Sequence, residues 1–202
     1  MIFFLKKVAL SVSTHNSQES TEDVILQMVK ACPEGRSGHA VLMQFFKKLK
    51  DGELSYEVKM DDGLDLTTEI ATAAIKRNCR LFMYLSMTNR SNFDLALLAV
   101  ERDGRNLRYA SYTLKNNKKI VQEAVKQNGN VLDFASDNLK ADREVVMEAV
   151  KQRGMALQYA SKELKGDREI VIEAVKQQGG VLAVASDDLK ADREVVMVAV
   201  KE

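Results

Sequence analysis

The residues of this chain that could act in catalysis are few and far apart in the sequence. Cys32 and His39 could form a thiol–imidazole pair, in which the imidazole removes the thiol proton. Such a nucleophile also needs a third group to orient the base, and His15, the only other histidine, falls in a polar stretch. Cys32 precedes Pro33 at the end of a predicted helix, where packing or exposure accounts for it. We therefore expect a non-enzymatic protein without a zinc site; Cys32 would be the nucleophile of an alternative enzyme.

The acidic stretch Asp61–Asp65 ("DDGLD") could offer carboxylates to a calcium ion. Calcium loops of the EF-hand type place their ligands at alternate positions and end in a glutamate at position twelve. This stretch has neither feature, so a turn followed by a helix N-cap is the favoured interpretation. We expect no metal ion and no cofactor.

Lysines recur in two rows that could follow a phosphate backbone. The rows are Lys115, Lys140, Lys165 and Lys190, and Lys126, Lys151, Lys176 and Lys201. Each lysine falls near the end of a predicted helix, where the helix dipole already favours a cation; Glu144, Glu169 and Glu194 fall near helix starts. The chain has 30 basic and 29 acidic residues and a net charge of +1. Nucleic-acid binding through the lysine rows is therefore only an alternative.

These rows follow from a constant sequence period of 25 residues, which is the separation of Lys115 and Lys140. The nine letters "LKADREVVM" occur at 139–147 and again at 189–197, two periods apart. Glycine recurs at Gly104, Gly129, Gly154 and Gly179, and an aromatic column at Tyr84, Tyr109, Phe134 and Tyr159. The aromatic rings could stack bases, but they border the apolar positions, so core packing is favoured. A fixed period of this length predicts an array of about five repeats over residues 66–202.

Each repeat reads as two short helices, as the stretch from Asp142 to Lys165 illustrates. Asp142 suits a helix N-cap, and Gly154 suits the left-handed residue that often ends a helix. The apolar stripe of the first helix is Val145, Val146, Ala149 and Val150, and that of the second is Leu157, Tyr159, Ala160 and Leu164. Helices of about 11 residues are marginal alone and must stack. The sequence therefore predicts a mainly α chain, an α-solenoid of two-helix repeats.

The unit "AVKQRGMALQYASKELKGDREIV", residues 149–171, resembles the helical repeat called domain of unknown function 4116. It is similar at the Ala-Val, Gly, Ala-Leu, Ala-Ser, Leu-Lys and Asp-Arg-Glu-Ile-Val positions, over roughly the C-terminal two thirds of the chain. Similar repeats occur in proteins of intracellular bacterial pathogens and of protists. The resemblance implies the fold and an interaction role inside cells, such as that of a bacterial effector or effector regulator, and no catalytic residue.

The N-terminal third, residues 1–65, departs from the repeat. A capping-style start at Ser20 predicts a helix that ends before Pro33, and "HAVLMQFFKKLK" at 39–50 predicts a second. Apolar residues alternate at 8–12 and at 54–60, which suggests two strands. We predict a small α+β cap of β-α-α-β order that covers the first repeat.

The composition indicates a protein that is neither secreted nor embedded in a membrane. The apolar start is interrupted by Lys6 and Lys7 and is too short for a transmembrane helix. Two cysteines form no disulfide framework and favour a reducing compartment. We expect a cytoplasmic protein, or one delivered into a host cytosol if it is an effector.

Two surfaces are candidates for binding a protein partner. The first, the variable face, consists of positions in the second helix that differ between repeats: Arg105, Arg108, Tyr112, Asn130, Asp133, Asp137, Met155, Gln158 and Lys162. Spacings of three and four place each trio on one face of a helix. An unconstrained solvated face explains these positions equally well.

The second candidate is an apolar C-terminal end. Val198 stands where the preceding repeats have a glutamate, and Val184 stands where they have an aromatic residue; Met197 is the third residue of this end. We expect this end to contact a second copy, a partner or further repeats.

Overall fold

The computed structural model describes residues 21–31, 42–46 and 66–201 of the 202-residue chain. Within these ranges the regular elements are α-helices and 3₁₀ helices and no strand occurs, so the prediction of a mainly α fold is confirmed. Both predicted N-terminal helices are present, as α2 (Thr21–Ala31) and a helical segment at 42–46. The two predicted strands, Cys32, His39 and Asp61–Asp65 lie outside the described residues.

The chain divides into two compact units, Met1–Ala99 and Val100–Glu202. The predicted boundary near residue 65 stays a prediction, since residues 47–65 are not described. In the first unit α2 packs against α4 (Thr68–Arg77), and the Arg77 guanidinium donates to the Lys30 carbonyl at 3.0 Å. The other elements that begin in this unit are η1 (Cys79–Tyr84), α5 (Met87–Arg90) and α6 (Phe93–Arg102). None of the described helices is long and apolar enough to cross a membrane.

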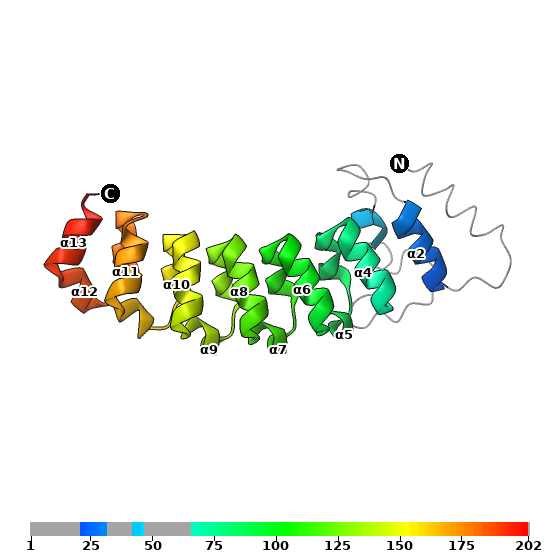
Figure 1. The fold of residues 1–202 in the computed structure, drawn as a ribbon, viewed down its shortest axis with the longest axis horizontal. Helices are drawn as coiled ribbons and strands as arrows, with labels where there is room; N and C mark the ends of the chain where they lie inside the picture. Colours follow the sequence, from blue (N-terminus) through cyan, green and yellow to red (C-terminus); the bar gives the residue numbers. More distant parts are fainter. Residues whose placement is uncertain (1–20, 32–41, 47–65, 202) are drawn as a thin grey trace. The chain divides into compact units, whose positions relative to one another are not determined.

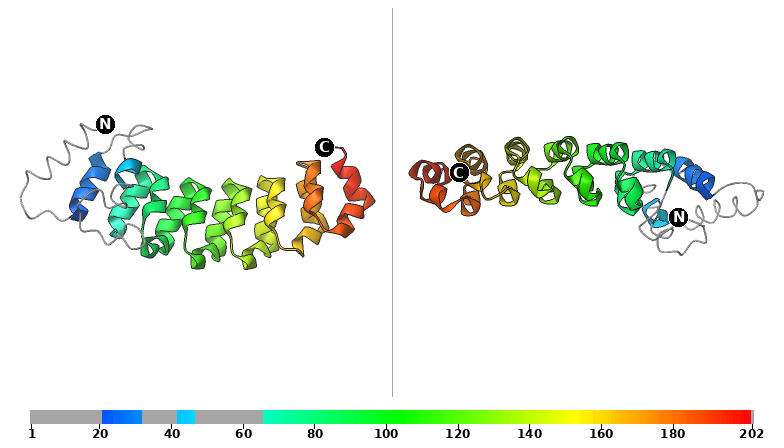
Figure 2. Two further views of the ribbon diagram at one scale, coloured as in Figure 1. Left: turned by 180° about the vertical axis from the view of Figure 1, so that it is seen from behind. Right: turned by 90° about the horizontal axis from the view of Figure 1, so that it is seen from below.

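The second unit is a stack of repeats in two layers (Figures 1 and 2). One layer holds the longer helices α8 (Lys118–Gln127), α10 (Arg143–Gln152), α11 (Arg168–Val175) and α13 (Arg193–Ala199). The other holds the 3₁₀ helices η2 (Gly104–Tyr109), η3 (Gly129–Phe134), η4 (Gly154–Tyr159) and η6 (Gly179–Val184). Short elements close each repeat: α7 (Tyr112–Lys115), α9 (Asp137–Lys140), η5 (Leu164–Gly166) and α12 (Asp187–Ala191). Neighbouring elements contact each other within both layers, as expected of an α-solenoid.

The helix α10 forms as the sequence predicts. Its N-cap is Asp142, whose Oδ1 accepts hydrogen bonds from the amides of Glu144 at 3.0 Å and Val145 at 3.2 Å. The stripe of Val145, Val146, Ala149 and Val150 is completely buried. Each buried valine contributes about 1.5–3 kcal/mol, but only because neighbouring repeats cover it.

The prediction that the second helix of a repeat is one continuous element is wrong. It begins as the 3₁₀ helix η4 and stops at Ala160, whose backbone is extended at φ −67° and ψ 159°. Ser161 then starts a new turn, with its Oγ accepting from the Leu164 amide at 3.3 Å. The break follows from stacking, because the Ser161 amide donates to the Lys140 carbonyl of the preceding repeat at 2.9 Å. Ser136 and Ser186 make the same bond, to Lys115 at 3.0 Å and Lys165 at 2.9 Å.

Gly154 also has a different role from the predicted one. Its backbone is not left-handed; the preceding residue, Arg153, is extended at φ −157° and ψ 113° and ends α10. A Cβ atom on Gly154 would lie 2.6 Å from the carbonyl oxygen of Ala174 in the next repeat. Glycine recurs with the period because the next long helix passes too close for any side chain.

Candidate interaction surfaces

The repeats of the second unit are joined at their surface by ion pairs between successive long helices. Arg143, at the start of α10, donates from Nε to Asp167 Oδ2 at 2.8 Å and from Nη2 to Glu169. Arg168 pairs in the same way with Asp192, at 3.5 Å, and with Glu194. We call each such set an ion-pair clamp: a basic residue at position i, an aspartate at i+24 and a glutamate at i+26.

The first clamp uses lysine. Lys118 Nζ lies 2.9 Å from Asp142 Oδ2 and 2.7 Å from Glu144 Oε2. The hydrogen bond that Lys118 donates to Glu144, followed by the one to Asp142, raises the pKa of Lys118. The predicted acidic row does stand in the first turn of each helix, but the basic residues that it pairs with were missed. The sequence did carry a signal for these pairs, because an aspartate and a glutamate follow each basic residue at the constant spacings i+24 and i+26.

The aspartate of a clamp has two tasks, capping its helix and binding the preceding repeat. Partial burial alone would raise the pKa of Asp167, but the hydrogen bonds from Arg143 and from the amides of Ile170 and Glu169 outweigh it. The pKa of Asp167 is therefore lowered, and that of Asp142 is lowered by the equivalent partners. These carboxylates favour their charged form in the folded protein.

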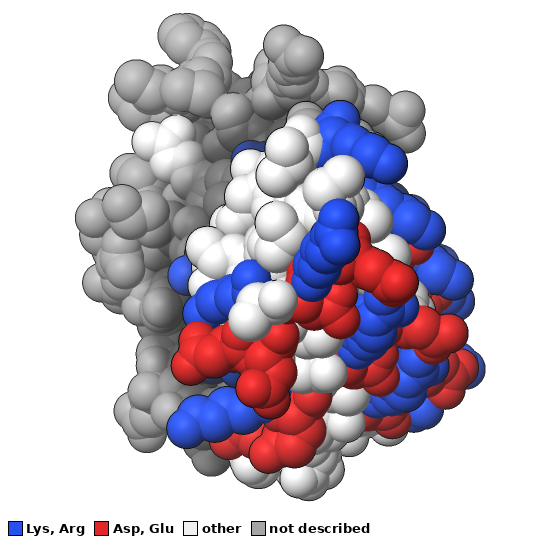
Figure 3. Space-filling view, turned by 90° about the vertical axis from the view of Figure 1, so that its left-hand side faces the viewer, with Lys and Arg blue, Asp and Glu red and all other residues white. Residues whose placement is uncertain are grey.

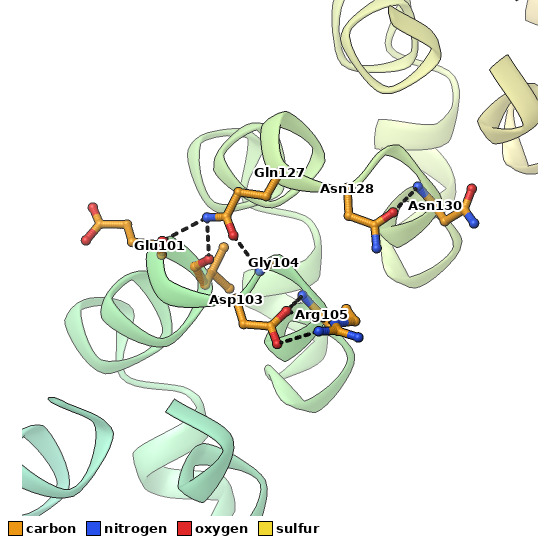
Figure 4. A network of polar contacts seen from close by, with 8 residues as sticks. Glu101, Asp103, Gly104, Arg105, Gln127, Asn128 and Asn130 are labelled. Carbon is orange, nitrogen blue, oxygen red and sulfur yellow. Dashed lines mark hydrogen bonds and ion pairs between the residues drawn. The ribbon is translucent and has the colours of Figure 1, made fainter. Parts of the chain in front are cut away.

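Glutamine side chains make a second kind of link between repeats (Figure 4). Gln127 Nε2 donates to the carbonyls of Val100 and Glu101, both at 2.9 Å, while its Oε1 accepts from the Gly104 amide at 3.0 Å. Gln177 makes the equivalent bonds to Val150, Lys151 and Gly154. Each glutamine satisfies backbone groups at the end of one helix and the start of the next element. Neither glutamine was predicted from the sequence to link repeats.

Seven of the eight lysines in the two rows stand in the last turn or at the C-cap of their elements, as Lys126 and Lys151 do in α8 and α10. The eighth, Lys201, follows the C-cap residue Val200 of α13. Lys126 also pairs with Glu123 at 3.4 Å, and Lys190 with Asp187 at 3.2 Å. Basic and acidic side chains are intermixed on the face of the molecule that Figure 3 shows. Among the described residues no group of three His, Cys, Asp or Glu side chains is placed to hold a metal ion.

The aromatic column is half-buried and therefore lines the edge of the core, not its centre. In the second unit it connects two repeats through Arg108. The guanidinium carbon of Arg108 lies 5.3 Å from the ring centre of Tyr109 and 5.5 Å from that of Phe134. These are cation–π distances, so Arg108 contributes to stacking as well as to the surface.

The variable face differs from the prediction in its backbone. Arg105 and Arg108 lie in η2 but Tyr112 lies in α7, beyond the extended Ala110, so no single helix carries the trio. The exposed members are Arg105, Arg108, Tyr112, Asp133, Asp137 and Lys162, and the half-buried ones are Asn130, Met155 and Gln158. Tyr112 is 78% exposed, and Arg105 pairs with Asp103 at 3.0 Å.

Some apolar side chains are exposed at the C-terminal end, and they are not all the predicted ones; that this end binds a partner stays a prediction. Met197 is 50% exposed, while Val184 and Val198 are half-buried. The most exposed valine is Val200, at 78%, which the prediction omitted. Figure 3, which faces this end, shows an area of uncharged side chains next to intermixed basic and acidic ones. Val200 holds the same repeat position as Val125, Val150 and Val175, which are completely buried. The sequence period could therefore have identified Val200 as an apolar residue of this end.

Comparison with known proteins agrees with the repeat geometry. No curated protein and no solved structure matches the chain. The family model described as a domain of unknown function, DUF4116, matches four overlapping segments, 92–140, 123–165, 142–183 and 167–202. Together these segments cover more than half of the chain and include every repeat of the second unit. The chain therefore belongs to the family of the domain of unknown function 4116.

Proposed function

We propose that this chain is a non-enzymatic scaffold that binds another protein through the variable face. The observation that carries the proposal is the 78% exposed ring of Tyr112 on a face whose other members are mostly charged. Exposed tyrosines are typical anchors of protein interfaces, because one rigid side chain offers both apolar area and a hydroxyl group. The positions that stack the repeats are buried and recur, whereas the positions of the variable face differ among the three repeats that carry it.

The charges of the variable face support a protein partner over a nucleic acid. Arg105 and Arg108 in one repeat are followed by Asp133 and Asp137 in the next and by Lys162 in the one after. A phosphate backbone is uniformly negative and would be repelled by the central pair. A protein surface with the complementary order of charges would fit all three repeats.

A location in the cytoplasm, or in a host cytosol as an effector or effector regulator, is part of the same proposal. It is supported by the resemblance to repeats of intracellular pathogens, and the partner would then be a cytosolic protein.

Affinity capture from a cytosolic extract tests the variable face. The variants are Arg108→Glu, Asp133→Lys and Lys162→Glu, and the matched control is Lys176→Glu, an exposed lysine at the end of α11. We expect specific bands that the wild type and the control retain and that the three variants lose. Identical captured proteins for all five chains would refute the variable face as the binding surface. Retention on oligonucleotides that weakens steeply with salt would instead favour the nucleic-acid alternative.

A further inference from the structure

Two aromatic rings hold the side chain of Arg108, and no carboxylate does. Its guanidinium carbon lies 5.3 Å from the ring centre of Tyr109 and 5.5 Å from that of Phe134 in the next repeat. The side chain is exposed, and among the described residues none makes a hydrogen bond or an ion pair with its nitrogens. Because stacking on two rings already restricts this long side chain, a ligand that binds it costs little further side-chain entropy.

Elsewhere in the second unit, arginines are held by carboxylates. Arg105, in the same 3₁₀ helix as Arg108, donates from Nε and Nη2 to the two carboxylate oxygens of Asp103, at 3.0 Å and 3.2 Å (Figure 4). Arg143 and Arg168 likewise donate to acidic residues of the next repeat. The planar guanidinium group fits a carboxylate in such pairs of charge-assisted hydrogen bonds. At Arg108 the rings do the positioning, so the N–H groups are available to a carboxylate from outside the chain.

We propose that Arg108 binds a carboxylate of the partner protein, from an aspartate or glutamate side chain, through two hydrogen bonds of its guanidinium group. This names the chemistry that the variable face recognises and rests on the proposed function. Tyr109 and Phe134 are positioning residues, because they hold the guanidinium group without using its N–H donors. Tyr112, exposed on the variable face, offers a ring to the apolar residues of the same partner.

The charges of the next repeat favour a carboxylate over a phosphate group. Asp133 holds the repeat position of Arg108, is exposed and forms no ion pair with it, and Asp137 is exposed as well. A phosphate group on a protein carries a charge of about −1.5 to −2 at pH 7, so both aspartates would repel it more strongly than a carboxylate. A basic residue next to the carboxylate in the partner would complement Asp133.

The test starts from a displayed library of random linear peptides, selected for binding to the immobilised full chain. We expect the enriched peptides to share an aspartate or glutamate, and a labelled peptide from this group to bind saturably when followed by anisotropy. Arg108→Lys keeps the positive charge but loses the planar pair of donors, so the Kd of the peptide should rise at least about tenfold. The matched control is Arg153→Lys, an exposed arginine outside the variable face, and it should change the Kd by less than about twofold.

A second variant tests whether the ring of Phe134 positions the arginine. Phe134→Leu leaves Arg108 and its charge in place, and the Kd should rise about three- to tenfold because the freed side chain must then be ordered on binding. Phe134→Tyr keeps a ring at this position and should restore the Kd of the wild type. A loss of binding that Phe134→Tyr shares with Phe134→Leu would refute the positioning role.

Three results would overturn the carboxylate site: no peptide that binds saturably, enriched peptides that share no acidic residue, or a Kd that Arg108→Lys leaves unchanged. Capture from the cytosolic extract separates this failure from that of the proposed function. Captured bands lost with Arg108→Glu but kept with Arg108→Lys would show a protein-binding face that needs only the charge. Acidic peptides that bind through Arg108, together with capture that no variable-face variant alters, would instead refute the face as the partner surface and leave the carboxylate site standing.

Discussion

Replacing Gly154 with alanine tests the account of the recurring glycine. The added Cβ would lie 2.6 Å from the Ala174 carbonyl oxygen, and restoring even a 3.4 Å contact requires the two backbones to separate by about 0.8 Å. The position of the Cβ is fixed by the backbone of residue 154, and the oxygen is a main-chain atom of α11, so neither atom can move without its backbone. Such overpacking costs about 1–3 kcal/mol, and the shift would also disturb the hydrogen bond from the Gly154 amide to Gln177.

The matched control is Gly180→Ala. Gly180 lies in the equivalent 3₁₀ helix of the last repeat, and no atom lies within 4 Å of a Cβ built there. Because its backbone suits any residue, alanine should be neutral or stabilise by about 0.4–1 kcal/mol. Urea unfolding followed by circular dichroism in the far ultraviolet gives both midpoints. A Gly154→Ala midpoint equal to or above that of the wild type would refute the close-approach explanation and favour a purely conformational role.

Three further predictions concern the links between repeats. Gln177→Ala should lower the free energy of unfolding, measured in urea, by about 1–2 kcal/mol, because it removes three hydrogen bonds between repeats. Gln152 holds the same repeat position but makes none of these bonds, so Gln152→Ala should lower the free energy of unfolding by less than half as much. Equal losses for the two variants would contradict this account. Because the pKa of Asp167 is lowered in the folded state, its contribution is complete above the ordinary value of about 4 and is lost as the pH falls through the folded value. Asp167→Asn, which keeps an N-cap acceptor, should therefore flatten the loss of melting temperature below about pH 4, and an unchanged acid profile would exclude this role. A double-mutant cycle of Arg168→Ala with Glu194→Ala should give a coupling of about 0.2–1 kcal/mol that shrinks in concentrated salt; coupling insensitive to salt would not fit an exposed ion pair.

The sequence was sufficient for the features that depend on one repeat at a time. Helix N-caps such as Asp142 and apolar stripes such as Val145 to Val150 follow from local spacing, and the period shows that the units stack. Lysines at helix ends were predictable for the same reason, since the helix dipole acts within one turn.

Features that join neighbouring repeats were harder to predict, because the sequence rules for a single helix take no account of the backbone of the next repeat. A recurring glycine is expected both where a helix ends in a left-handed residue and where a neighbouring backbone passes very close, as Ala174 passes Gly154. The sequence alone does not distinguish the two causes. The extended Ala160 arises because the Ser161 amide bonds to Lys140 and not within its own helix. The continuous helix expected through Arg105, Arg108 and Tyr112 failed at the equivalent residue, Ala110.

The backbone bonds from Ser136, Ser161 and Ser186, each to a lysine carbonyl of the preceding repeat, have a consequence for how such a chain can change in length. They, the clamps and the glutamine links all join residues about one period apart, so every link refers only to the adjacent unit. A gene segment encoding one whole repeat could thus be duplicated or deleted inside the array, and the rejoined units would find equivalent partners. A loss or gain of codons that is not a whole repeat would misalign every link across the junction.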